Sequence, residues 1–253
     1  MPLISILTPA WNAARTLPMA KAGIDAQSLT DWEWLVADDG SDDGSQEMLA
    51  AWSRKDPRIR LLSGKGRAGP ALARARALAE AKGRFLAFLD ADDSWHSDKL
   101  AAQTAAHRAT PTPLTYTGWQ AIDAQGAPLG RGHAVPERLT YRALLCNTAI
   151  VCSSAMIDRE QSGPVTIRNE PVDDYVLWLS LLSPRIHPPG RTAIGLPAPL
   201  TLYRRAPGSL SSRPCRAASW AWHTYRHVEC LSLPYSLWCF AHYAARAVVK
   251  RMG

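Results

Sequence analysis

Several features that would place this sequence in a secreted or membrane-spanning class are missing. The 253 residues contain five cysteines, at positions 146, 152, 215, 230 and 239, and these form no C-x-x-C pair. Because an odd number of cysteines fits poorly with a framework of exported disulfides, we expect reduced thiols. No stretch reaches the ~18 to 20 uninterrupted apolar residues that a membrane-spanning helix needs.

The sequence also lacks a secretory signal at its beginning and acidic residues towards its end. The apolar segment Leu3–Leu7 has no basic flank before it and no small-residue cleavage site after it, so we expect a cytoplasmic protein. From Thr201 onward there are eight Arg or Lys residues and one acid, Glu229, whereas the preceding 200 residues carry 21 of each sign. Inferences from charge therefore concern the tail and not the front of the chain.

What the sequence does contain is a regular alternation of strand and helix patterns over its first hundred residues. Four short apolar segments are typical of strands: 3–8, 32–37, 58–62 and 84–89. Between them lie three segments typical of helices: 13–27, 45–54 and 71–82. This alternation predicts βαβ units and a Rossmann-like, mostly parallel α/β sheet flanked by helices.

The pattern is less regular beyond residue 99. We expect helices at 99–107, 139–146 and 172–182 and strands at 114–119 and 150–157. The interval 183–214 is rich in proline, which favours extended, loop-rich backbone. Two helices should follow. We therefore divide the chain into a catalytic domain of residues 1–210 and a helical, basic and aromatic extension of residues 211–253.

Clusters of aspartates close two of the predicted strands. Asp90, Asp92 and Asp93 follow an apolar run in RFLAFLDADDSW, and Asp38 and Asp39 follow the second strand. Turn chemistry alone explains one such cluster, because aspartate side chains accept backbone N–H bonds in turns and at helix N-caps. Two clusters at the carboxyl ends of parallel strands meet at one sheet edge, where α/β folds bind ligands. Carboxylates there suit Mg²⁺ or Mn²⁺ and a phosphorylated substrate.

A third acidic pair, Asp173 and Asp174, begins the apolar helical segment DDYVLWLSLL. The structural explanation is a helix N-terminus, where the helix dipole stabilises carboxylates by about 0.3 to 1 kcal/mol, and for Asp173 this explanation is sufficient. For Asp174 we expect more, because the apolar residues behind it would hold its carboxylate partly desolvated. Desolvation raises the pKa of a carboxyl group towards that of a useful general base.

In their order and spacing, several segments resemble the family-2 inverting glycosyltransferases of the GT-A fold. These segments are ISILTPAWN, VADDGSDDGS, FLDADDSW, SSAMIDR, DDYVLWLSLL and LYRRAPGSLSS. The tail from Ser219 is similar to that of capsule, exopolysaccharide and teichuronic-acid-type members, so the resemblance covers essentially the whole chain. It implies transfer of a sugar from a nucleotide-sugar, by default a UDP-sugar, to a hydroxyl of a growing cell-surface polysaccharide or lipid-linked glycan. The implied cofactor is Mn²⁺ or Mg²⁺.

The resemblance also assigns a nucleotide-sugar site. Its residues are Thr8, Pro9, Asn12, Asp38, Asp39, Arg74, Asp90, Ala91, Asp92 and Arg204. Within this set, Asp38 and Asp39 match the acids that contact the base, Arg74 matches an arginine that faces the nucleotide, and Arg204 is a weaker candidate for the diphosphate.

The metal site and the catalytic base are assigned in the same way. Asp90-Ala91-Asp92 matches the DxD motif, with Asp92 as the direct metal ligand and Asp90 as a ribose or water-mediated contact. Asp174 matches the catalytic base. The chain departs from the family at Asp173, where Glu is usual, at Ala75, where Asn often follows the arginine, and in the loop GRAG, which replaces Asn-Gly-Gly.

The basic, aromatic tail has two explanations from its sequence. It forms an amphipathic helix packed on the domain, or an interfacial helix that contacts anionic membrane through residues 219–253. The second would place the protein peripherally on the inner face of the cell membrane.

Two rival functions are open at this point. A haloacid-dehalogenase-like sugar phosphatase also presents D-x-D after an apolar strand, but it leaves the pairs at 38–39 and 173–174 unexplained. A nucleic-acid-binding protein would use the basic tail as a stacking and phosphate platform. Three acidic clusters in the front domain would repel phosphate, so we expect no nucleic acid partner.

Overall fold

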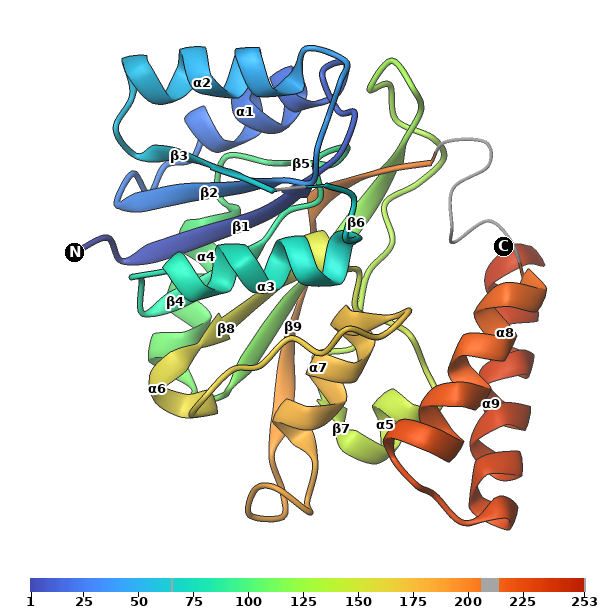
Figure 1. The fold of residues 1–253 in the computed structure, drawn as a ribbon. Coiled ribbons are helices and arrows are strands. Elements are labelled where there is room, and N and C mark those ends of the chain that lie inside the picture. Colours follow the sequence, from blue (N-terminus) through green and yellow to red (C-terminus); the bar gives the residue numbers. More distant parts are fainter. Residues whose placement is uncertain (65, 206–213, 253) are drawn as a thin grey trace.

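The computed structural model describes residues 1–64, 66–205 and 214–252, in which a nine-stranded sheet lies between two layers of helices (Figure 1). The strands are β1 (Ile4–Ala10), β2 (Trp32–Asp38), β3 (Ile59–Ser63), β4 (Phe85–Phe88), β5 (Ser94–Trp95), β6 (Leu114–Ile122), β7 (Arg138–Thr140), β8 (Ala155–Asp158) and β9 (Thr192–Arg204). Their order across the sheet is β3-β2-β1-β4-β8-β6-β9-β5, and β7 pairs with β9.

Helices cover both faces of this sheet. The helices of the described residues are α1 (Leu17–Asp25), α2 (Ser45–Lys55), α3 (Pro70–Glu80), α4 (Lys99–Ala109), α5 (Tyr141–Leu145), α6 (Arg159–Ser162), α7 (Asp173–Leu182), α8 (Pro214–His223) and α9 (Leu233–Met252). Buried residues of α1, α2 and α4 form one core with Ile6 and Trp34 of the sheet, and those of α3, α5 and α7 form a second core with Leu7 and Leu35. Because both faces are covered, β1 and β2 are buried along almost their whole length.

The first hundred residues fold as the sequence predicts. β3, β2, β1 and β4 are parallel neighbours that α1, α2 and α3 connect. The carboxyl ends of β1, β2 and β4 therefore meet at one edge of the sheet. The parallel order ends at β8, which runs antiparallel to both β4 and β6.

The proline-rich interval 183–214 differs from the prediction. It contains β9, a strand of 13 residues that pairs with β6, β7 and β5. Pro197 and Pro199 lie where the β6–β9 ladder changes register, so their missing N–H groups remove no ladder bond. The prediction of extended backbone agrees with β9, whereas the prediction of a loop-rich interval was wrong for residues 192–204.

Two shorter elements also differ from the prediction. The helix expected at 139–146 begins at Tyr141, because the residues before it pair with β9 as β7. The strand expected at 150–157 is replaced at its start by a 3-10 turn, Cys152–Ser154, and only then continues as β8. This turn brings Ser153 against the residues that follow β4.

Gly118 lies at the register change between β6 and β9. A Cβ atom at this position would lie 2.4 Å from the carbonyl oxygen of Pro197 and 2.8 Å from that of His133, so only glycine fits. Beyond this point β6 and β9 resume their pairing, and consecutive residues of β9 point to opposite faces of the sheet. Arg204, the last residue of β9, lies buried on the side of α1.

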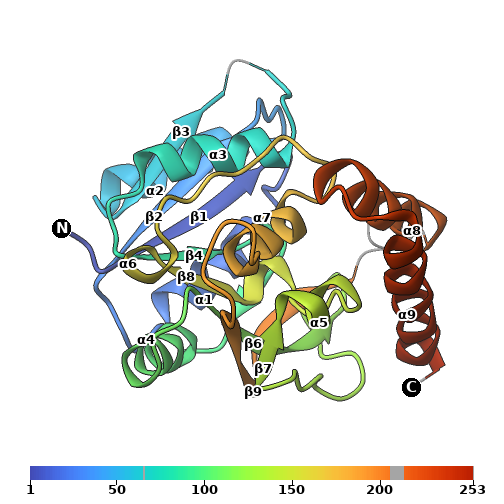
Figure 2. The ribbon, with the colours of Figure 1, turned by 90° about the horizontal axis from the view of Figure 1, so that it is seen from below.

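The tail consists of α8, a π-helical turn at Thr224–Val228, and α9. Both views place α8 and α9 at the side of the molecule towards which β1 and β2 run (Figures 1 and 2). Tyr225 and Cys239 belong to the same buried cluster as α7. The domain division proposed at residue 210 lies outside the described residues and stays a prediction. Within the described part of the chain, no helix is both long and apolar enough to span a bilayer.

Candidate active site

Asp38 shapes the loop that follows β2. One of its oxygens accepts hydrogen bonds from the backbone N–H groups of Gly40 and Ser41, each at 3.0 Å, and from the side-chain amide of Gln46 at 2.7 Å. Its other oxygen accepts the hydroxyl of Ser41 at 2.5 Å. Asp38 is fully buried. The carboxylate predicted to contact the base therefore supports a turn.

Asp39 is built differently. One carboxylate oxygen accepts the N–H groups of Ala68 and Gly69, at 2.9 and 2.7 Å, just before α3 begins. The other oxygen, Oδ1, is buried and has no hydrogen-bond partner among the described residues. A buried acceptor without a donor is costly, by about 1 to 3 kcal/mol, unless a ligand supplies the donor. Asp39 thus has the free acceptor that its neighbour lacks.

The loop after β1 supports the loop after β2. Asn12 has a left-handed backbone (φ 48°), its side-chain oxygen accepts the N–H of Asp42 at 3.0 Å, and its own N–H donates to Ser41 Oγ at 2.8 Å. Thr8 is fully buried and accepts the indole N–H of Trp34. Of the three residues predicted for the first nucleotide loop, Thr8 and Asn12 serve the architecture of the site, and Pro9 lies partly buried between them.

Trp11 is a residue that the sequence reasoning did not single out. Its ring is 44% exposed, and the guanidinium of Arg67 lies 3.7 Å from the ring centroid. Trp11 follows Ala10, whose carbonyl accepts the N–H of Asp39 at 2.8 Å. An exposed aromatic residue directly after a buried strand was the available signal.

In the loop after β4, Asp93 points inward and Asp92 points outward. Asp93 is 1% exposed and accepts the hydroxyl of Ser153 at 2.5 Å and the backbone N–H of Arg204 at 2.8 Å. Ser153 also accepts the backbone N–H of Asp90 at 3.0 Å. Asp93 is therefore a scaffold for the D-A-D motif and not a third ligand, with Ser153 as its partner.

Asp92 is the exposed carboxylate of this loop. Protein atoms crowd it on its inner side, and this partial desolvation, followed by the negative charge of Asp90, raises the pKa of Asp92 to about 6. Arg204 is nearby but is occupied, since its Nε donates to the backbone carbonyl of Asp92 at 2.8 Å and a terminal nitrogen donates to that of Asp123 at 2.6 Å. The arginine predicted for the diphosphate thus fixes the loop that carries Asp92.

Arg74 connects the loop after β4 with the start of α7. Its guanidinium donates to Asp90 at 2.9 Å and forms an ion pair with Asp173. Burial alone would lower the pKa of Arg74, but the neighbouring Cys152 and aspartates raise it well above the ordinary value. Its Nε is buried without a partner among the described residues. Arg74 thus bridges two acidic segments that lie 83 residues apart in the chain.

Asp174 lies half-buried in the first turn of α7. Desolvation first, and the negative charge of Asp173 second, raise the pKa of Asp174 to about 6, although Arg74 acts in the opposite direction. One of its oxygens accepts the N–H of Tyr175. A carboxylate with this pKa is ionised at neutral pH and still basic enough to accept a proton.

The acidic residues fit a divalent cation with few protein ligands. No three His, Cys, Asp or Glu side chains of the described residues converge as a complete metal site. Asp92 and Asp90 are nevertheless close enough for one charge to perturb the other, and Mg²⁺ or Mn²⁺ often binds one or two carboxylates and takes its remaining ligands from water and substrate phosphate. The donor set therefore suits a cation that arrives with a phosphorylated substrate.

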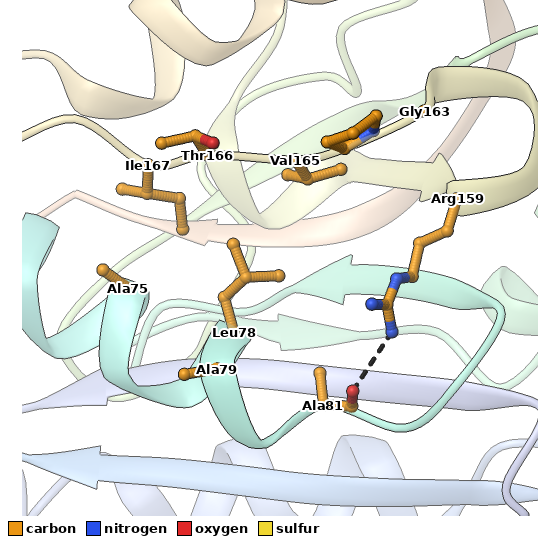
Figure 3. A pocket seen from close by; sticks show the side chains of 10 residues that line it. Ala75, Leu78, Ala79, Ala81, Arg159, Gly163, Val165, Thr166 and Ile167 are labelled. Atoms are coloured by element: carbon orange, nitrogen blue, oxygen red, sulfur yellow. Dashed lines mark hydrogen bonds between the residues drawn. The ribbon is translucent and has the colours of Figure 1, made fainter.

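A cavity of about 570 Å³ lies elsewhere, between α3 and residues 163–167. Figure 3 shows Leu78 facing Ile167 across it, with Arg159 bonded to the carbonyl of Ala81. None of the acidic residues described above lines this cavity. It belongs to the seam between α3 and the segment that leads to α7.

The sequence of the chain is similar to those of known glycosyltransferases. The family model for Glycosyl transferase family 2 matches residues 5–161. The chain is 38% identical to the putative teichuronic acid biosynthesis glycosyltransferase TuaG of Bacillus subtilis, with 99% of this chain and 98% of the relative covered. It is 32% identical to the UDP-Glc:α-D-GlcNAc-diphosphoundecaprenol β-1,3-glucosyltransferase WfgD of Escherichia coli, with 87% and 84% covered.

Solved structures share the fold. TarS of S. aureus in complex with UDP-GlcNAc aligns with a TM-score of 0.70 at 14% identity, covering 95% of this chain and 71% of TarS. The mannosyltransferase PcManGT of Pyrobaculum calidifontis, in complex with GDP-Man and Mn²⁺, aligns with a TM-score of 0.67 at 18% identity, covering 100% and 76%. The predicted GT-A fold is confirmed. The family model matches more than half of the chain, and the alignment with TuaG, at 38% identity, covers 99% of it. The chain therefore belongs to glycosyl transferase family 2.

Proposed function

We propose that this glycosyltransferase moves a sugar, with inversion, from a UDP-sugar to a hydroxyl of a lipid-linked or growing cell-surface glycan. The observation that carries the proposal is the bridge made by Arg74, which joins Asp90 of the D-A-D motif to Asp173, the neighbour of Asp174. This bridge holds the donor-side acid and the proposed base in one network. A phosphatase has no need of the second acidic pair.

The donor is proposed from the residues around Asp39. A uracil ring carries an imide N–H, which would satisfy the buried Oδ1 of Asp39, and its face would fit against the exposed ring of Trp11. The names of WfgD, which includes UDP-Glc, and of TarS bound to UDP-GlcNAc support this choice of nucleotide. Arg67 would then have to leave the face of Trp11 or share it with the base.

The reaction needs a base on the acceptor side. We propose that Asp174 accepts the proton of the acceptor hydroxyl as that oxygen attacks the anomeric carbon, which contributes about 10²- to 10⁴-fold to the rate. Asp92, with Asp90, would hold the Mg²⁺ or Mn²⁺ that neutralises the departing diphosphate. A single displacement inverts the anomeric centre. Retention would require a double displacement with a second nucleophile, and we nominate no described residue for that role.

The acceptor and the place of reaction are proposed from the relatives. TuaG is named for teichuronic acid biosynthesis, and WfgD is named for a diphosphoundecaprenol-linked acceptor. A polyprenyl acceptor resides in a bilayer, so the enzyme would work at the inner face of the cell membrane, where nucleotide-sugars are available. Nucleic acid has no role in this proposal.

The proposal is tested with Asp174→Asn, measured against UDP-sugars with Mn²⁺ by release of free UDP and by transfer to acceptor. We expect the dissociation constant for UDP-sugar to change less than about threefold and transfer to fall by about 10²- to 10⁴-fold. Asp25→Asn, at the exposed end of α1, is the matched control and should be fully active. Near-normal transfer by Asp174→Asn would refute the assignment of the base. Release of phosphate from sugar phosphates by the unaltered protein would favour the phosphatase.

A further inference from the structure

The helix α9 is apolar on a side that the protein does not cover. Residues 233–245 contain no Lys, Arg, Asp or Glu. Leu233, Leu237 and Trp238 are 52%, 53% and 50% exposed, and Ala241 and Ala244 beside them are exposed as well. We call the surface formed by Leu233, Leu237 and Trp238 the outer face of α9. Large apolar side chains in such a group mark an interaction surface more often than a solvated one.

The opposite side of α9 already holds the helix on the domain. Cys239 is fully buried in the core that includes α7, and Phe240 and Tyr243 pack against that core. The ring of Phe240 also meets the edge of Trp222 in α8, at 5.7 Å between centroids. The outer face is therefore not needed to attach α9 to the domain. Packing on the domain, one of the two explanations from the sequence, accounts for the buried side of α9 and not for its outer face. A helix that is hydrophobic all round is normally covered on all sides.

Trp238 is held at the surface by its neighbours. Its ring stacks on Tyr235 at 5.7 Å with an interplanar angle of 11°, and it meets His242 edge-on at 4.4 Å. A large amphipathic ring fixed at a protein surface is typical of positions that lie at the level of lipid headgroups, because one end of the ring is apolar and the other carries an N–H.

The charge of the tail indicates which partner fits. The one acid after residue 200, Glu229, is 8% exposed, and its carboxylate accepts the hydroxyl of Tyr141 at 2.5 Å. The tail therefore presents no exposed carboxylate in its described residues. In the sequence of α9, the uncharged residues 233–245 are followed by Arg246, Lys250 and Arg251. An apolar face next to a run of cations is complementary to an anionic bilayer, at about 1 kcal/mol of attraction for each basic residue near the surface.

We propose that the outer face of α9 is the surface by which this enzyme docks on an anionic lipid bilayer, with Leu233, Leu237 and Trp238 entering the headgroup layer. The inference rests on the proposed function only in that a lipid-linked acceptor gives the docking a purpose. A second copy of the chain is the other occupant of an apolar face, and the test below distinguishes it from a bilayer.

The test is sedimentation of the full chain with vesicles of phosphatidylglycerol and phosphatidylcholine, or of phosphatidylcholine alone. We expect the unaltered protein to bind the anionic vesicles and the double variant Leu237→Ser, Trp238→Ser to bind them at least about tenfold more weakly. Ile186→Ser, at a position 59% exposed outside the tail, is the matched control and should bind normally. Both side chains of the double variant are half in solvent, so the fold should persist.

Two further readouts separate the possible failures. Release of UDP from UDP-sugar in solution should be equal for the double variant and the unaltered protein, whereas transfer to an acceptor embedded in vesicles should fall with binding. Equal vesicle binding by both proteins overturns the proposal, and so does a dimer of the unaltered protein that the double variant converts to monomer in light scattering. If the unaltered protein releases no UDP, the proposed function fails, while the vesicle result still decides the role of the outer face.

Discussion

The two acidic loops at the sheet edge look alike in sequence and are built in different ways. In the loop after β2, Asp38 is satisfied by groups within eight residues of itself. In the loop after β4, Asp93 and Asp90 are held by Ser153 and Arg204, which are at least 60 residues away. The turn around Asp38 is a product of local chemistry, although Asn12 and the residues before α3 also bond to the first loop. The second depends on the whole fold, and changes at distant positions should therefore affect it.

The largest effect is expected for the exposed acid of the second loop. Asp92→Ala removes the carboxylate proposed to hold the cation, so metal-dependent binding of UDP should be lost and transfer should fall by about 10²-fold or more. Titration of UDP against the protein with and without Mn²⁺ measures the first effect. UDP binding that responds to Mn²⁺ equally in the variant and the unaltered protein would contradict the metal assignment.

The support of the second loop should be nearly as important. Ser153→Ala removes the hydroxyl that Asp93 and the N–H of Asp90 share, so we expect about a tenfold loss of transfer, a higher requirement for Mn²⁺ and a loss of about 1 to 3 kcal/mol in unfolding free energy. Ser154→Ala is the control, because the hydroxyl of Ser154 donates to the carbonyl of Val151 in its own turn and does not contact the D-A-D motif. If Ser153→Ala and Ser154→Ala show the same Mn²⁺ requirement, Ser153 does not support the D-A-D motif in the way described.

In the first loop, we expect Asp39 to contribute to donor binding and Asp38 to contribute to stability. Asp39→Asn replaces one of the two carboxylate oxygens of Asp39 with an NH₂ group. The KM for UDP-sugar should therefore rise by about tenfold with little change in kcat. Asp38→Asn should leave KM nearly unchanged and lower the unfolding free energy by about 1 to 3 kcal/mol, because the Asp38 carboxylate is used within the loop. Denaturant unfolding and initial rates measure the two effects, and an exchange of the two outcomes would refute the division.

The smallest expected effect is on the dependence of rate on pH. The raised pKa of Asp174, about 6, means that the base is protonated and inactive below that pH and ionised above it. At saturating Mn²⁺ the rate should fall about tenfold from pH 7 to pH 5, whereas a carboxyl of ordinary pKa would leave it nearly constant. Arg74→Lys weakens the bridge, so the midpoint should move to higher pH. A midpoint near pH 4 would contradict the account of Asp174.

These contrasts also explain what the sequence could and could not predict. The strand and helix periods predicted the parallel half of the sheet, and the position of the acids after β2 and β4 predicted that they share an edge. The sequence could not show that Asp38 supports its loop while Asp39 keeps a free acceptor, or that Asp93 is buried while Asp92 is exposed. Adjacent residues in a turn point in different directions, and contacts made elsewhere in the fold decide which direction each takes. Whether each assigned residue binds the donor stays a prediction.

Arginine positions were the least predictable part of the site. Arg74 could be assigned to the nucleotide side by resemblance, but its ion pair with Asp173 spans 99 residues and leaves no pattern in the sequence. Arg204, a candidate for the diphosphate, donates to the backbone carbonyl of Asp92, and its contact with the diphosphate stays a prediction. The long, flexible arginine side chain reaches several partners from one position, so only the packed structure determines which one it contacts.

The lack of a side chain at Gly118 affects the geometry of the D-A-D motif, although the two lie far apart in the sequence. Because β6 and β9 approach each other so closely there, β9 can change register between Leu196 and Thr201 while β6 advances only from Thr117 to Trp119. That shift sets which residues of β9 reach the loop after β4, and so which backbone N–H meets Asp93 and which guanidinium meets the carbonyl of Asp92. A methyl group added at position 118 would act on the motif from a distance, by misaligning the strand that supports it.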